Sequence, residues 1–158
     1  MIEEIERDGC VYAIIIRASF HKKNCIEFCT PNDFSQQLAY MNRPKGYVIQ
    51  PHIHNPVPRS IHYTQEALFI RQGRLRTDFY DRQQNYLESV VLEEGDVILL
   101  VNGGHGFQAL EEVEMVEVKQ GPYAGEADKT RFKGIVINQL FWKEASMYDF
   151  IYSLESGI

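Results

Sequence analysis

Three histidines and one glutamate have the residue types and spacing for a metal or acid–base site. His52 and His54 are two residues apart, Glu66 opens an apolar, β-rich run, and His105 follows a turn with two glycines. On a strand over 47–54, both imidazoles would point to the same face. Two neutral imidazoles and a carboxylate suit a borderline divalent metal such as Zn, Fe, Mn or Ni. We expect such an ion on His52, His54, Glu66 and His105.

Two alternatives to this ligand set stay open. His62 lies four residues before Glu66. If both belong to one strand they share a face, and His62 could replace Glu66 or His54 as a ligand; otherwise it covers the pocket from a loop. The four groups could also work without a metal, with one histidine as a general base.

The elements that must position these residues are short strands. From Gly46 onward, β-branched and apolar runs alternate with turn residues about every ten positions, which predicts an all-β sandwich or barrel. Glu66 shares the phase of Leu68 and Ile70, as a side chain of a barrel interior requires. The expected strands are 11–17, 25–30, 47–54, 61–71, 74–80, 86–92, 96–101, 107–110 and 113–119, the last with a bulge between Met115 and Val116.

Two short helices are also expected. One spans 34–41, capped by Asp33, and the other spans 143–154, where apolar residues have helical spacing. The strand over 11–17 is apolar on both faces, which predicts cover from the core on one side and from a second subunit on the other.

The site residues lie in two stretches that resemble the motifs of the cupin superfamily. The first motif is matched by Gly46, five residues, His52-Ile53-His54, then Glu66, six residues and Gly73. Eleven residues separate His54 from Glu66 where the family has a short gap, so residues 55–62 form an insertion. The second motif is matched less closely from Gly95 to His105: Val101 replaces a proline, the histidine is one residue early, and Ala109 replaces an asparagine.

The resemblance covers 46–120 and implies one cupin domain over 1–158, with 121–158 as a loop and C-terminal extension. The implied fold is an antiparallel β-barrel or double-stranded β-sandwich (jelly roll) with a short C-terminal helix. The implied function is metal-dependent isomerase, epimerase or dioxygenase chemistry on a small molecule. A loose similarity near 117–132 to cupins of polysaccharide and sugar biosynthesis favours a sugar. The alternatives are a non-catalytic ligand-binding or sensing cupin and a metal-free enzyme like the nucleotide-sugar epimerases. A homodimer is expected, as is common among small cupins.

Further residues are candidates for the substrate pocket: Gln50, Arg59, His62 and Phe107. Gln50 and Phe107 have the strand parity to face inward, and Arg59 lies in the insertion, which should form a proline-stiffened flap over the site. Arginine can clamp a carboxylate or phosphate. Other groups are expected to have structural roles. Arg71, Arg74 and Arg76 should lie on a solvated face, and Tyr47, Tyr63 and Tyr80 should pack. Lys129 and Arg131 should lie in a solvated loop, but they would bind an anion if the substrate carries phosphate.

Composition excludes several classes of protein. The net charge of −6 and the lack of a basic run argue against nucleic-acid binding. The longest apolar run has six residues, far below the roughly 20 that span a bilayer, so no membrane partner is expected. The acidic start is unlike a signal peptide, which favours the cytoplasm. There Cys10, Cys25 and Cys29 should be reduced.

Overall fold

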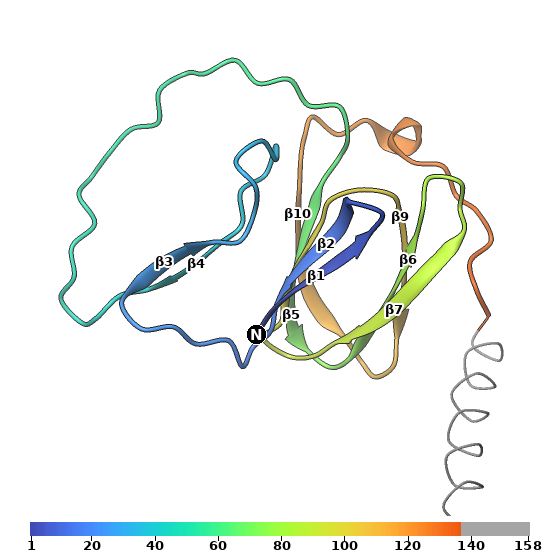
Figure 1. The fold of residues 1–158 in the computed structure, drawn as a ribbon, viewed down its shortest axis with the longest axis horizontal. Helices are drawn as coiled ribbons and strands as arrows, with labels where there is room; N and C mark the ends of the chain where they lie inside the picture. The colour runs from blue at the N-terminus through green and yellow to red at the C-terminus, as the bar shows by residue number, and fades with distance from the viewer. Residues whose placement is uncertain (137–158) are drawn as a thin grey trace, which may run out of the picture.

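The structure, a computed structural model, describes residues 1–136; the helix predicted over 143–154 lies outside the described residues. It is nearly all β, which confirms the predicted class, but none of the sheets closes into a barrel (Figure 1). The elements are β1 (Ile2–Arg7), β2 (Cys10–Ile16), β3 (Cys25–Phe28), β4 (Ala39–Asn42), β5 (Glu66–Gln72), β6 (Leu75–Tyr80), β7 (Tyr86–Leu92), β8 (Val97–Leu100), β9 (Gly104–Ala109), β10 (Glu114–Lys119) and a 3₁₀ turn, η1 (Gly125–Asp128).

Two antiparallel sheets form a sandwich, which we call the body. One has five strands in the order β1-β2-β8-β5-β10, and the other has three in the order β7-β6-β9. Apolar side chains of both sheets make one buried cluster, because alternate residues of each strand point to the same side. Its buried members are Ile5, Tyr12, Ala13, Ile15, Leu68, Ile70, Leu75, Phe79, Leu92, Ile98 and Leu100.

Strand β2 is buried on both faces, as its sequence predicted. Ala13 and Ile15 join the cluster between the sheets, and Ile14 on the opposite face is also fully buried. On the outer side of the five-stranded sheet, Phe34 and Leu38 pack against a second small cluster. Part of the cover therefore comes from the same chain.

Strand β6 is also covered on both faces, although its alternation predicted one solvated face. Arg76 donates two hydrogen bonds to the buried Asp78, so its assignment to a solvated face is wrong. Tyr80 contacts Phe132 edge-on, with ring centroids 5.0 Å apart, and its hydroxyl accepts a hydrogen bond from the amide of Ile135. Segment 130–136 can cross here because β9 presents only glycine hydrogens, at Gly104 and Gly106, beside Tyr80.

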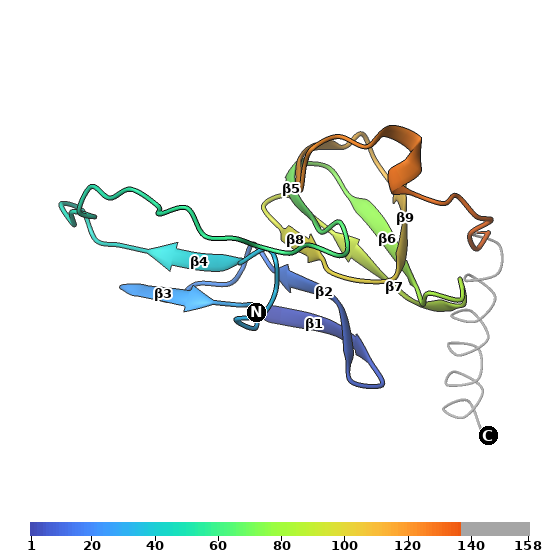
Figure 2. The same ribbon diagram turned by 90° about the horizontal axis from the view of Figure 1, so that it is seen from above.

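Residues 25–62, which we call the arm, project from one end of the body (Figure 2). The predicted helix over 34–41 is wrong, because residues 39–42 pair with β3 as strand β4. The predicted strand over 47–54 is also absent: residues 43–65 contain no strand. A strand needs a hydrogen-bonded neighbour, and in the described part of the chain nothing pairs with 47–54.

Turns and strand ends explain the smaller differences. Gly73 and Gly103 have positive φ, and a Cβ at either position would collide with backbone oxygen. Strand β5 begins at Glu66 rather than at 61, and the β10 bulge falls between Glu114 and Met115, one residue before its predicted position. Within residues 1–136 no helix has the length and apolar character to cross a membrane.

Candidate functional site

Glu66 and His105 meet at one end of the body, between its two sheets. Glu66 is the first residue of β5 and shares the inward phase of Leu68, while His105 on β9 pairs with the core residue Phe79. Both side chains therefore point inward, as the strand phase of Glu66 predicted for that residue. Glu66 Oε2 lies 3.3 Å from His105 Nε2, and the two side chains are 13% and 30% exposed. The result is a half-buried carboxylate–imidazole pair that solvent can still reach.

Lys119 adds a positive charge to this pair. It is the cross-strand partner of Glu66 at the end of β10, and its Nζ lies 4.0 Å from Glu66 Oε1. The contact with His105 is the main influence that lowers the pKa of Glu66, opposed by burial and aided by the charge of Lys119. Glu66 is thus an ionised carboxylate at neutral pH. Sequence reasoning missed Lys119, because its partner is set by strand register rather than by any local motif.

The segment after β10 forms one rim of the site. Gln120 accepts a hydrogen bond of 2.7 Å from the amide of Gln65, and Asp128 accepts one of 2.8 Å from the hydroxyl of Thr64. These contacts tie both ends of 120–128 to the residues just before Glu66. Of the two basic residues proposed nearby, Arg131 pairs with Glu126, whereas Lys129 also helps to lower the pKa of Glu66.

His52 and His54 form a second pair, on the arm. Their ring centroids lie 5.2 Å apart at an interplanar angle of 81°, and His52 Nδ1 is 3.0 Å from the carbonyl oxygen of Gln50. Both imidazoles are exposed. His52 and His54 thus lie side by side, as expected, although they are not on a strand.

The structure does not bring the two pairs together. Among residues 1–136, no group of three or more His, Cys, Asp and Glu side chains is placed to hold a metal ion. As arranged in one chain, the predicted ligand set therefore does not fit a metal centre and consists of two half-sites, His52 with His54 and Glu66 with His105.

The predicted pocket residues are divided in the same way. Phe107 lies next to His105 on β9, with ring centroids 5.2 Å apart, and is partly exposed in the site. Gln50, Arg59 and His62 lie on the exposed part of the arm. The strand face predicted for His62 and Glu66 does not exist, because β5 begins only at Glu66.

A further contact, not predicted from the sequence, anchors the end of the arm beside the site. Arg82 stacks 3.9 Å over the ring centre of Tyr63 and donates a hydrogen bond of 2.6 Å to its hydroxyl. The same guanidinium donates to the side-chain oxygen of Asn102, in the turn that precedes His105. Residues 63–65 are therefore fixed to the body, whereas 47–62 are exposed throughout.

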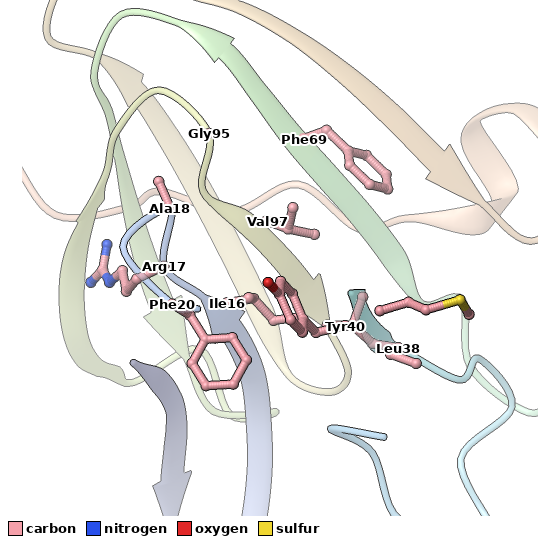
Figure 3. A pocket seen from close by; sticks show the side chains of 11 residues that line it. Ile16, Arg17, Ala18, Phe20, Leu38, Tyr40, Phe69, Gly95 and Val97 are labelled. Carbon is pink, nitrogen blue, oxygen red and sulfur yellow. The ribbon is translucent and has the colours of Figure 1, made fainter. Parts of the chain in front are cut away.

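A cavity of about 300 Å³ lies elsewhere, between the outer face of the five-stranded sheet and the β3–β4 hairpin (Figure 3). Ile16, Phe69 and Val97 line it from the sheet, and Leu38 and Tyr40 line it from the hairpin (Figure 3). Among residues 1–136, its lining contains no carboxylate, imidazole or thiol. It is a mainly apolar space, with the Tyr40 side chain and Arg17 as its polar groups.

One charged residue of the described lining, Arg17, stabilises the fold. Arg17 donates to both carboxylate oxygens of Glu3 at 2.9 Å, and to Asp96 at 2.8 Å. The hydrogen bond from Arg17 lowers the pKa of Glu3.

The three cysteines are free thiols, and burial raises the pKa of Cys29.

Comparison with known proteins identifies no relative of this chain: no family model, no curated protein and no solved structure matches it.

Proposed function

We propose that the protein binds a small molecule at the open end of the sandwich and acts on it through the Glu66–His105 pair. The observation that carries this proposal is the 3.3 Å contact between the two side chains, each supplied by a different sheet. A carboxylate that holds an imidazole fixes its orientation and stabilises its protonated form, which is the arrangement of a general base.

The contact also assigns a role to each ring nitrogen. Nε2 of His105 faces Glu66, which leaves Nδ1 to accept a proton from a substrate. The exposed edge of Phe107 offers an apolar surface for the ligand, and Lys119 offers a cation for a developing negative charge. Proton abstraction in an isomerase or epimerase reaction fits this set. The loose similarity near 117–132 to cupins of polysaccharide and sugar biosynthesis supports a sugar-like substrate.

The test is a panel of sugar phosphates and nucleotide sugars, assayed for turnover and for binding. With a substrate found, His105→Ala should lower kcat by about 10²- to 10⁴-fold, the usual contribution of a general base. Glu66→Gln should give a smaller loss, because the imidazole remains. His21→Ala, on an exposed turn, is the control. If His105→Ala and Glu66→Gln both retain full kcat, the proposal is wrong; binding without turnover would indicate a sensing protein.

A divalent metal on His52, His54, Glu66 and His105 is the second candidate. The observation that favours it is that each half-site already brings two potential ligands close together. Bound zinc would act there as a Lewis acid. Elemental analysis and zinc titration test this candidate, because a complete set should bind zinc and lose it as pH falls through the imidazole pKa, near 6–7.

A further inference from the structure

Strand β9 has a free edge beside the Glu66–His105 pair. Among the described residues it pairs with β6 alone and ends the three-stranded sheet. Its inward face carries His105, Phe107 and Ala109, in register with Phe79, Thr77 and Leu75. A free edge presents unpaired N–H and C=O groups and is a template for another strand. An added strand here would lie directly against the site.

Residues 47–54 of the arm have the properties of the missing strand. The segment is rich in exposed apolar side chains, including Tyr47, Val48, Ile49 and Ile53, the last 91% exposed. Such a concentration of exposed apolar groups marks an interaction surface. Pro51 is compatible with an edge strand if its nitrogen faces away from the neighbour. The side chains of Gln50, His52 and His54 then share one face, opposite that of Ile49 and Ile53.

In its own chain the arm holds this segment away from β9. The hairpin that precedes the segment is packed on the body through Leu38 and through an edge-on contact of Phe20 with Tyr40. Only four residues separate Asn42, the end of β4, from residue 47, so these two positions lie at most about 18 Å apart. Figures 1 and 2 both place 47–54 at the end of the molecule away from β9.

We propose that two copies of this chain exchange arms, so that 47–54 of one copy adds as a strand to the free edge of β9 in the other. The exchange places His52 and His54 beside Glu66 and His105 of the second copy and joins the two half-sites into one site. It is reciprocal, and it closes as a symmetric dimer with two sites. This inference rests on the proposed function for the location of the site, but strand exchange itself can be measured without any ligand.

Charge and shape complement each other in this arrangement. The carboxylate of Glu66 and the exposed edge of Phe107 lie on the inward face of the sandwich. The imidazoles of His52 and His54 and the side chain of Gln50 from the other copy would face them. On the outer face, the ring of Phe132 already lies against Gly104, and Ile49 and Ile53 would arrive beside it. The added strand would remove Phe107 of one copy, and Ile49 and Ile53 of the other, from water.

A matched pair of proline substitutions tests the exchange. Since the nitrogen of Pro51 must face away from β9, the N–H of Ile49 faces away too, and that of Val48 faces β9. Val48→Pro should therefore raise the dimer dissociation constant at least about tenfold, because each dimer loses a ladder hydrogen bond twice. Ile49→Pro should change it by less than about threefold. Light scattering across a dilution series should give twice the 18.4 kDa chain mass for the wild type.

Complementation between two disabled chains tests whether the site forms in trans. One chain carries His52→Ala and His54→Ala, and the other carries Glu66→Gln and His105→Ala. In a mixed dimer, one of the two sites has all four groups. After the chains are mixed, zinc binding should therefore recover to about one quarter of the wild-type amount per chain, while either variant alone binds none. Assembly within one chain predicts no recovery.

The outcomes separate this inference from the metal candidate. If the wild type dimerises and Val48→Pro weakens the dimer but no zinc binds, arm exchange stands and the metal candidate fails. If the chain is monomeric at all concentrations, if Val48→Pro and Ile49→Pro behave alike, or if wild type binds zinc and mixed chains recover none, arm exchange is overturned. Hydrogen exchange provides a second readout: amides of 47–54 should become protected as the protein concentration rises.

Discussion

The body and the arm both contain apolar runs that resemble strands, yet in the arm one such run has no partner strand. In the body, runs such as 75–80 and 97–100 are buried between neighbours on both sides. In the arm, the run 47–54 carries Tyr47, Val48, Ile49 and Ile53 but is exposed. The difference teaches that apolar pattern specifies a strand only where a partner edge is within reach of the chain. Four predictions probe the contrast, from the largest expected effect to the smallest.

A matched pair of phenylalanine truncations should separate the two regions most clearly. Phe79 on β6 is 1% exposed and Phe28 on the arm is 66% exposed. Phe79→Ala should lower the free energy of unfolding by about 4 kcal/mol, through lost burial and a cavity in the core. Phe28→Ala should change it by less than about 0.5 kcal/mol. Urea unfolding measures both, and equal effects would erase the distinction between body and arm.

The ion network of Arg17 should rank second, because it joins three elements of the body. Arg17→Met keeps the length of the side chain but removes its bonds to Glu3, Asp96 and the carbonyl oxygen of Val91. Asp96 is left buried without its cation, so the free energy of unfolding should fall by about 2–3 kcal/mol. The pKa of Glu3, followed by NMR, should rise toward its ordinary value. An unchanged Glu3 titration would mean that the network does not form in solution.

Glu66 should make the stability of the body depend on pH. Its pKa is lower in the folded than in the unfolded chain, so its stabilisation is present above the unfolded pKa and is lost as pH falls through the folded pKa. Glu66→Gln should therefore cost about 1 kcal/mol near neutral pH, and this cost should disappear in acid, below the folded pKa of Glu66. Urea unfolding at both pH values measures the difference. A cost that stays constant with pH would contradict the assigned charge.

The surface pair Arg71–Glu114 should have the smallest effect, although it lies in the body. Its atoms are 2.9 Å apart, but both side chains are more than half exposed. Arg71→Ala should change the free energy of unfolding by less than about 0.5 kcal/mol, because solvent screens exposed pairs. A larger loss would indicate that the surface of the body is more strongly coupled than the geometry implies.

Strand existence and parity were predictable from the sequence where the signal is local. The alternation around Glu66 and the glycines before His105 correctly placed both side chains inward. Lys119 was not found, because its place beside Glu66 depends on the register of two strands about 50 residues apart along the chain.

Two other elements could not be predicted from the local sequence pattern. Strand β1 reads IEEIER and shows little β signal, but it is an edge strand whose Glu3 is held by Arg17. The helix expected over 34–41 had a plausible cap, yet pairing of residues 39–42 with β3 outweighs local propensity. In each case pairing with the neighbouring strand in the sequence decided the outcome.

The position of the arm in the chain has a consequence for how its reach can change. Strand β2 precedes the arm and strand β5 follows it, and both pair with β8. The body therefore fixes the positions of the two ends of the arm. The entropic cost of closing such a loop grows only with the logarithm of its length, about 0.6 kcal/mol for each doubling. Insertions or deletions in 55–62 should therefore retune how far the arm extends while the body folds almost unchanged.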